Sequence, residues 1–169
     1  MRLAFACAVA LMAIAAPAAL AANTSGLVSF EFGLLQQLNA VRADHNLAPL
    51  RTNVKLAAAA DQHTQEMADD GYFDHNSQDG TSFANRIARW YPIGSYHSWT
   101  VGENLLWSSP TVDPAAAVAM WMKSPPHRAN ILNPRFREIG IGAVHSTSAG
   151  GAYGNLPVMI VTTDFGVRR

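Results

Sequence analysis

The fold is decided by the stretch REIGIGAVHS at residues 137–146, together with PVMIVTTDFG at residues 157–166. Both stretches are rich in β-branched residues and are bounded by turn-forming residues, which is typical of strands. The glycine-rich connection at residues 147–155 separates them and suits a long hairpin. A third stretch, SWTVGENLLW at residues 98–107, is also strand-like, although a helical turn at ENLL is an alternative. The sequence therefore predicts a sheet of three to four antiparallel strands.

Four segments before the late strands have the apolar periodicity of helices. Three of them begin with a recognisable signal, namely the N-cap residues Ser29 and Asn53 and the pair Asp113-Pro114, and Gly71 is a plausible stop for the second helix. The four predicted helices cover residues 30–46, 54–70, 82–90 and 114–123. Pro125 and Pro126 forbid continuation of the last helix, so we expect a turn there. Helices that precede strands, without β-α-β alternation, predict an α+β fold in which helices cover an antiparallel sheet.

The chain begins with a segment typical of a secretory signal peptide. A short basic start precedes an alanine-rich apolar run, which ends in the small-x-small pattern of residues 19–21. Pro17 within the run argues against a membrane anchor. We expect cleavage of residues 1–22, a polar linker over 23–28 and one domain over 29–169. The mature protein would be extracellular or periplasmic, without a transmembrane segment.

Cysteine content and charge narrow the classes of partner. The only cysteine, Cys7, lies in the predicted signal peptide, so the mature domain must be stabilised by packing without disulfides. Twelve Lys and Arg residues balance twelve Asp and Glu residues, and there is no run of five basic residues. This balance argues against nucleic acid and anionic membrane surfaces as partners. No motif defines the oligomeric state.

Three residues that are distant in the sequence are candidates for a shared cleft. His75 and His127 lie in predicted loops, and Glu103 lies in the apolar strand-like stretch. A buried carboxylate needs a partner, and the natural partners are imidazoles or a metal. Two histidines and a carboxylate can hold a divalent cation such as zinc. No local motif such as H-E-x-x-H occurs, so the residues alone favour a structural hydrogen-bond network. Asp164 is expected to be a strand-end hydrogen-bonding residue.

The order of the motifs resembles the CAP superfamily, also called the SCP domain family, and in particular its cysteine-free bacterial branch. The superfamily comprises cysteine-rich secretory proteins, antigen 5 and plant pathogenesis-related 1 proteins. The resemblance covers residues 34–166. It rests on the stretches LLQQLNAVRADHNLAPL, LAAAADQHTQEMADDGYFDHNSQDG, VGENLLW, AVAMWMKSPPHRANILNPRFREIGIG and VMIVTTDFG. It implies an α-β-α sandwich, with helices on both sides of the sheet and a central cleft.

The cleft of this family carries two histidines and two glutamates. The match places the histidines on His75 of FDHNS and on His127 of PPHRANIL, and the first glutamate on Glu103 of GEN. The second glutamate is expected on the helix that contains Trp121, which has no acidic residue here. This departure weakens acid–base catalysis by a glutamate pair but leaves a two-histidine metal site intact.

Three further residues are expected to support the cleft. Arg128 and Asn130 are expected to fix the turn after Pro126 by hydrogen bonds to backbone carbonyls, so that His127 lies over the cleft. Asn104, which follows Glu103, is included as a third supporting residue.

Two functions from different classes follow from these expectations. The first is a secreted binding module, whose cleft holds a divalent cation such as zinc and whose grooves take a small lipid or sterol, as the resemblance implies. The second is a peptidase-like hydrolase that uses zinc-bound water on the two histidines, with Glu103 as general base. The absent second glutamate favours the binding module. No organic cofactor is expected.

Overall fold

The computed structural model describes the backbone of residues 16–169 and the side chains of residues 25–169. The helices are α1 (Ala16–Asp44), α2 (Val54–Asp70), α3 (Phe83–Trp90), α4 (Pro114–Lys123) and α5 (Pro125–Ile131), with a 3-10 turn η1 (Gly151–Tyr153). The strands are β1 (Arg51–Thr52), β2 (Trp99–Ser108), β3 (Glu138–Ala149) and β4 (Leu156–Arg168). Most of the predicted signal peptide, with Cys7, lies outside the described residues. None of the helices within residues 16–169 has the length and apolar character needed to cross a membrane.

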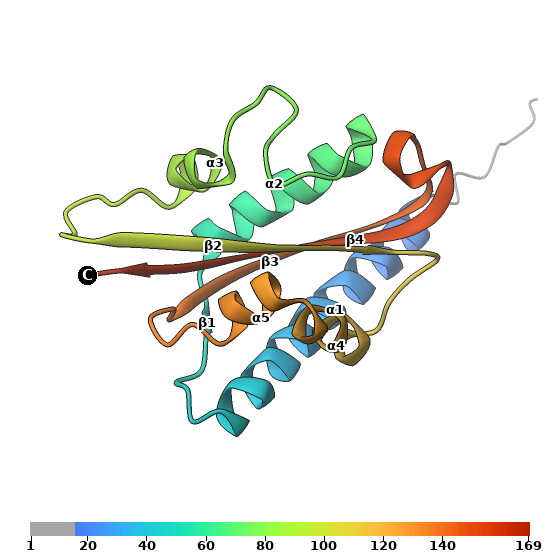
Figure 1. The fold of residues 1–169 in the computed structure, drawn as a ribbon. Helices are drawn as coiled ribbons and strands as arrows, with labels where there is room; N and C mark the ends of the chain where they lie inside the picture. The colour runs from blue at the N-terminus through green and yellow to red at the C-terminus, as the bar shows by residue number, and fades with distance from the viewer. Residues whose placement is uncertain (1–15) are drawn as a thin grey trace, which may run out of the picture.

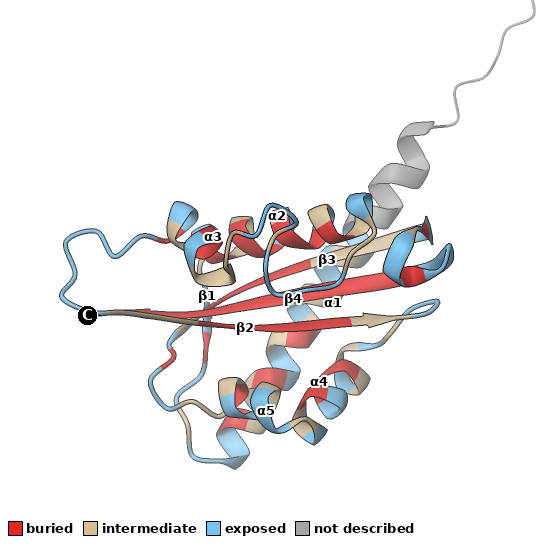
Figure 2. Cartoon of the chain, turned by 45° about the horizontal axis from the view of Figure 1, so that its top comes forward, coloured by how far each residue is buried: buried red, intermediate tan, exposed pale blue. Residues whose placement is uncertain are grey.

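The elements form three layers, with the sheet in the middle. Helices α2 and α3 cover one face of the sheet, and α1, α4 and α5 cover the other (Figure 1; Figure 2). The strand order is β1-β3-β4-β2. Strand β4 pairs antiparallel with both β3 and β2, which confirms the predicted long hairpin and the strand at residues 98–107. The expected α+β sandwich is therefore confirmed.

The sheet departs from the prediction at one edge. Strand β1 pairs in parallel with β3, so the sheet is mixed and not wholly antiparallel. Only two residues form β1, Arg51 and Thr52, and both are exposed. A strand this short has too few positions for an alternation of apolar and polar residues, so no periodic pattern in the sequence predicts it.

Helix α1 begins earlier than its sequence pattern predicts. The helix starts at Ala16 and not near Phe30, so the expected linker over residues 23–28 is helical. The alanine-rich segment ahead of Gly26 favours helix, and one glycine costs only about 1 kcal/mol relative to alanine. Helix α1 ends at Asp44, shortly before Asn46, whose φ of 56° is left-handed.

The ends of the other helices follow their predicted capping residues. The side chain of Asn53 accepts hydrogen bonds at the start of α2, and Gly71 ends that helix with a φ of 68°. The carboxylate of Asp113 caps α4 through the N–H of Ala116. The turn expected after α4 is wrong, because Pro125 begins the short helix α5. Proline is favourable in the first turn of a helix, where its missing N–H would have no partner.

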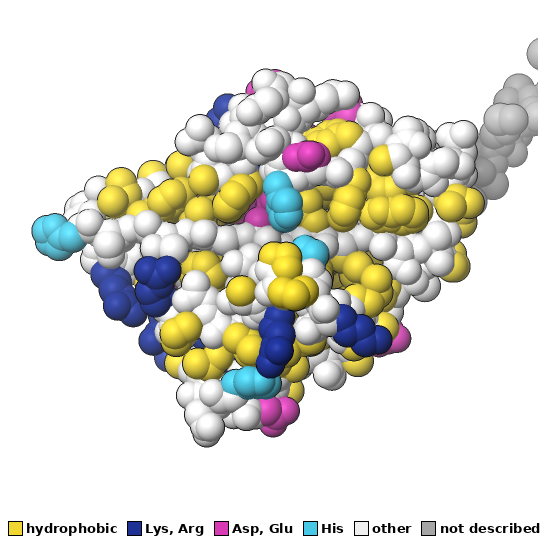
Figure 3. Space-filling model, in the orientation of Figure 1, with side chains coloured by type: hydrophobic (Ala, Val, Ile, Leu, Met, Phe, Trp, Pro, Cys, Tyr) yellow, Lys and Arg dark blue, Asp and Glu magenta, His cyan; other side chains and the backbone are white. Residues whose placement is uncertain are grey.

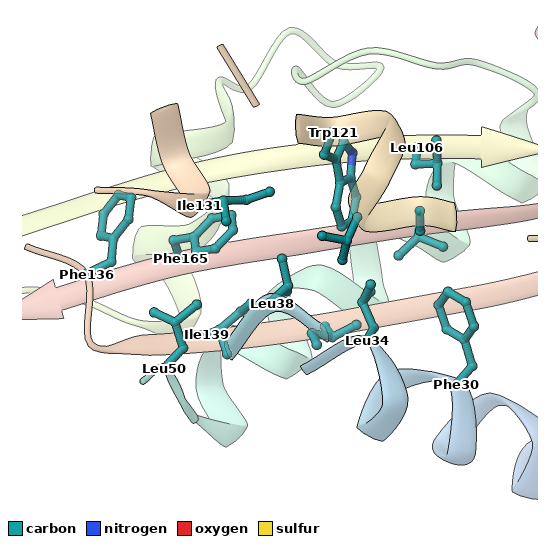
Figure 4. Close-up of a cluster of buried hydrophobic side chains, with 14 of the residues drawn as sticks. Phe30, Leu34, Leu38, Leu50, Leu106, Trp121, Ile131, Phe136, Ile139 and Phe165 are labelled. Carbon is teal, nitrogen blue, oxygen red and sulfur yellow. The ribbon is translucent and has the colours of Figure 1, made fainter. Parts of the chain in front are cut away.

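The largest apolar core lies between the sheet and the layer of α1, α4 and α5. Leu34 and Leu38 on α1 meet Trp121 on α4 and Phe165 on β4, and all four are almost fully buried (Figure 4). On the opposite face, α2 lies directly against β3. A Cβ atom on Gly140 would come within 2.0 Å of the backbone carbon of Leu56. Large apolar side chains fill the face covered by α1, α4 and α5. The face covered by α2 and α3 carries Glu103 and its partner Arg86.

Candidate functional site

His75, Glu103 and His127 share one cleft. His75 lies in the loop that follows α2, Glu103 in the middle of β2 and His127 in α5. The cleft has a volume of about 430 Å³ and is also lined by Phe83 and Val101. Figure 3 shows histidine and acidic side chains near the centre of one face of the molecule, with hydrophobic side chains on both sides of them. Residues from three separate segments thus line the same hollow.

The carboxylate of Glu103 organises the floor of the cleft. Its Oε1 atom lies 2.8 Å from Nδ1 of His75, and its Oε2 atom accepts a hydrogen bond from the guanidinium of Arg86 on α3. Arg86 also donates to the backbone carbonyl of His75 over 2.9 Å. The side chains of Glu103 and Arg86 are almost fully buried, whereas 48% of the His75 side chain is exposed. Glu103 and Arg86 therefore hold His75 at the boundary between protein and solvent.

Asp164 on β4 lies directly opposite Glu103 on β2 in the antiparallel pair. It is fully buried, and neither of its carboxyl oxygens accepts a hydrogen bond from a described residue. Burial, and then the charge of Glu103, raise the pKa of Asp164 well above its usual value. The protonated form of Asp164 is therefore favoured, and its proton is available for a hydrogen bond to Glu103.

His127 is held through its backbone. Nδ2 of Asn104 donates to the carbonyl of His127 over 3.1 Å, and Nδ2 of Asn130 donates to the carbonyl of Glu103 over 3.0 Å. A Cβ atom on Gly102 would lie 2.8 Å from Oδ1 of Asn130, so this close approach of α5 to β2 requires glycine. The two asparagines thus attach α5 to the strand that carries Glu103.

The pKa values of the two cleft histidines are shifted in opposite directions. The hydrogen bond to Glu103 raises the pKa of His75, although partial burial opposes it. Burial, and then the charge of His75, lower the pKa of His127. His127 is therefore a neutral imidazole at neutral pH, with a lone pair available to a ligand. Because Nδ1 of His75 faces the carboxylate, Nε2 is the ring nitrogen of His75 that does not bind Glu103.

The structure does not bring every candidate into the cleft. Arg128 is exposed, and its side chain forms no hydrogen bond with a described residue, so its expected role in fixing the turn is not seen. His63 is fully buried on α2, where Nε2 binds the carbonyl of Asp74 over 2.9 Å. Because Asp74 precedes His75, this hydrogen bond fixes the loop that presents His75.

Two residues of the site have no clear signal in the sequence. Arg86 lies in a helical pattern next to Ile87, where an arginine usually faces solvent. Asp164 was expected at the end of a strand, but it lies within β4. The only available signal was the buried carboxylate of Glu103, which requires a partner. Glu103 has two partners, the expected imidazole of His75 and the guanidinium of Arg86.

The described residues contain no group of three or more His, Cys, Asp or Glu side chains placed to hold a metal ion. The donor set that remains consists of the imidazoles of His75 and His127. Imidazole nitrogens suit zinc and similar divalent cations, provided that water or a solute supplies the other ligands. A cation held by these two imidazoles would keep open coordination positions, unlike a cation in a closed structural site.

Comparisons with known proteins give the family of the chain. The profile described as "CAP: Cysteine-rich secretory protein family" matches residues 35–163. The uncharacterized protein YkwD of Bacillus subtilis (strain 168) is 35% identical over 124 residues, which are 73% of this chain and 46% of that protein. The uncharacterized membrane protein YlbC of the same organism is 31% identical over 109 residues, covering 64% of this chain and 30% of that protein. The chain thus spans less than half the length of these curated relatives.

Two solved structures have a similar fold. An outer surface protein from Borrelia burgdorferi superposes with a TM-score of 0.64 at 21% identity, over 80% of this chain and 90% of that chain. An extracellular protein containing a SCP domain from Bacillus anthracis str. Ames superposes with a TM-score of 0.59 at 28% identity, over 81% of this chain and 41% of that chain. The three-layer arrangement is therefore shared with solved structures.

Proposed function

This chain belongs to the cysteine-rich secretory protein (CAP) family, and we propose that it is an exported binding domain whose cleft holds a divalent cation between His75 and His127. The observation that carries the proposal is the hydrogen bond between Nδ1 of His75 and Glu103. Histidines that bind metals in proteins usually donate their second ring N–H to a carboxylate or carbonyl group, which fixes the tautomer and orients the ring. Glu103 supplies that carboxylate, and Nε2 is the nitrogen left for the cation.

The cation would supply open coordination positions in the cleft. With two protein ligands, the remaining positions belong to water or to a carboxylate or carbonyl of a bound molecule. The apolar walls at Phe83, Val101 and Pro126 would contact the rest of that molecule. The cleft of about 430 Å³ lies within the size range of ligand sites, roughly 300–1,000 Å³.

The contacts of Glu103 favour binding over hydrolysis. A general base needs a carboxylate oxygen within reach of the proton that it removes. Both oxygens of Glu103 are already bound, one by His75 and one by Arg86, and the side chain is buried. The hydrolase that uses Glu103 as general base therefore has less support than the binding domain.

Binding of a lipid or sterol stays a prediction, and a groove separate from the histidine cleft is the candidate site for it. A groove of about 220 Å³ lies beside α1 and is lined by Leu27, Phe30, Val112 and Met159. Most of its walls are apolar, as an acyl chain requires, and Thr111 and His145 add polar groups. We treat it as secondary, because it includes none of the residues of the cleft.

Export is supported by the relatives and by the N-terminal sequence. The similar solved structures are described as an outer surface protein and an extracellular protein. The apolar run and the small-x-small pattern of residues 19–21 are those of a signal peptide. N-terminal sequencing of the mature protein should begin at about residue 22 or 23, and a start at Met1 would contradict cleavage.

Isothermal titration calorimetry with zinc tests the proposed cation site. The wild-type protein should bind one zinc ion, and His75→Ala and His127→Ala should each abolish measurable binding. Glu103→Gln should weaken binding by about 10- to 100-fold, because the orienting carboxylate is lost. The control is His97→Ala, since His97 is exposed in a loop outside the cleft. Equal zinc binding by the wild type and the double histidine variant would overturn the proposal.

A further inference from the structure

Helix α1 carries a second apolar stripe that does not face the core. Phe30, Leu34 and Leu38 pack into the core. Val28 and Phe32 lie one turn apart on another side of the helix and are 59% and 64% exposed. With Leu35 and with Ile141 on β3, they line a groove of about 210 Å³ between α1 and α2. This groove includes none of the residues of the histidine cleft.

The groove also contains an acidic side chain without a cationic partner. Glu31 lies between Val28 and Phe32 and lines the groove. It is half-buried, close enough to feel the charge of Asp61 on α2, and it accepts a hydrogen bond from the backbone N–H of Ala143 on β3. Within residues 25–169, neither Glu31 nor Asp61 forms an ion pair. Glu31 therefore lies beside an apolar wall and within the electrostatic influence of a second carboxyl, and no ion pair among residues 25–169 compensates its charge.

An ionised Glu31 is unfavourable in this groove unless a cation binds next to it. Burial, and then the charge of Asp61, raise the pKa of Glu31 to about 7, and partial burial raises the pKa of Asp61 as well. A cation next to Glu31 would relieve both effects, because an opposite charge stabilises a carboxylate in a partly buried position. The exposed side chains of Val28 and Phe32 would at the same time cover apolar surface of the ligand.

We propose that the groove between α1, α2 and β3 binds an amphiphilic cation, that is, a molecule with a protonated amine and a short alkyl or aromatic group. The amine pairs with Glu31, and the apolar group lies along Val28, Phe32 and Ile141. The volume of the groove is below the roughly 300 Å³ at which ligand pockets usually begin, so the occupant is a small molecule. Neutral and anionic amphiphiles of the same length lack the charge that the groove requires.

The test compares n-octylamine with n-octanol and octanoate by NMR titration of the purified protein at about pH 8, where Glu31 is ionised. Octylamine should shift the signals of Val28, Phe32 and Ile141, with a Kd about tenfold or more below that of octanol, corresponding to about 1.4 kcal/mol. Octanoate should bind more weakly than octanol. Equal affinity for the three probes, tighter binding of octanoate, or no binding of octylamine would each overturn the proposal.

Three variants locate the binding on the structure. Glu31→Gln should remove the preference for octylamine over octanol, and Phe32→Ser should weaken octylamine binding while leaving the fold intact, because Phe32 is exposed. Asp44→Asn is the matched control, since Asp44 lies at the far end of the same helix and should leave binding unchanged. An unchanged preference in Glu31→Gln would contradict the assigned role of this carboxyl.

Discussion

The two faces of the central sheet are built from different chemistry. On the face covered by α1 and α4, the side chains of Leu106, Val161 and Phe165 belong to the largest apolar cluster. On the face covered by α2 and α3, Glu103 and Asp164 lie side by side on adjacent strands. The first face gains stability from buried area, whereas the second face holds two neighbouring carboxyl groups in a fixed relation.

This difference separates stability from function within one domain. The apolar face needs only residues of suitable volume, so it tolerates changes that keep the packing. The polar face depends on each partner, because a buried charge that loses its partner becomes strongly unfavourable. That dependence is useful for function, since the same contacts that neutralise Glu103 also orient His75 toward the cleft.

The largest expected effect comes from Arg86→Met. The substitution leaves Glu103 buried without its cationic partner and should reduce the free energy of unfolding by about 3–5 kcal/mol. Adding Glu103→Gln should restore part of the loss, because the uncompensated charge disappears. Urea denaturation of the single and double variants measures both values. A double variant that is as unstable as the sum of the two single variants would contradict this coupling.

The control on the apolar face is Leu38→Ala. It removes a fully buried side chain and should cost about 2–5 kcal/mol through lost burial and a cavity. Combining it with Glu103→Gln should give an additive loss, because the two residues lie on opposite sides of the sheet. Strong coupling between Leu38 and Glu103 would contradict the separation of the two faces.

Asp164→Asn should change how the free energy of unfolding depends on pH, which is a smaller effect. The pKa of Asp164 in the folded protein lies above its unfolded value near 3.8, so the folded state binds the proton more tightly. The stability of the wild type relative to Asp164→Asn should therefore fall as pH rises above about 4, by up to about 1.4 kcal/mol per pH unit, until the folded pKa is passed. Denaturation of both proteins across a pH series measures the difference. A difference that does not change with pH would contradict a neutral Asp164.

The pKa of His75 tests a single contact of the polar face, the hydrogen bond between His75 and Glu103. The hydrogen bond to Glu103 is the largest cause of the raised pKa of His75. Glu103→Gln should therefore lower the pKa of His75, while the exposed His97 keeps its wild-type titration. NMR titration of the histidine ring signals measures both residues in one experiment. An unchanged His75 would mean that Glu103 does not control its protonation.

The sequence predicted the parts of the fold that depend on local patterns. Capping residues such as Asn53 and Asp113 gave the starts of α2 and α4, because their side chains act within one turn of the helix. Strand β1 and helix α5 were missed, since a two-residue strand has no periodicity and a pair of prolines can either end one helix or begin another. Local patterns do not reveal pairings between distant segments.

Only part of the candidate site could be predicted, because the site also depends on contacts between distant segments. The sequence identified Glu103 as a carboxylate in apolar surroundings, and the structure gives it His75 as a partner. Arg86 and Asp164 were not found, because their roles arise only when α3 and β4 lie against β2. Arg128 was overestimated, because its place next to His127 in the sequence does not decide which side of α5 it occupies.

The most direct test of the central claim is the protonation state of each ring nitrogen of His75, read by long-range ¹H–¹⁵N NMR before and after zinc is added at about pH 8. We expect Nδ1 of His75 to carry the proton, because it faces Glu103, and zinc to shift the signals of Nε2 of His75 and of one ring nitrogen of His127. A proton on Nε2 of His75 in the free protein, or a zinc response that leaves His127 unchanged, would contradict it.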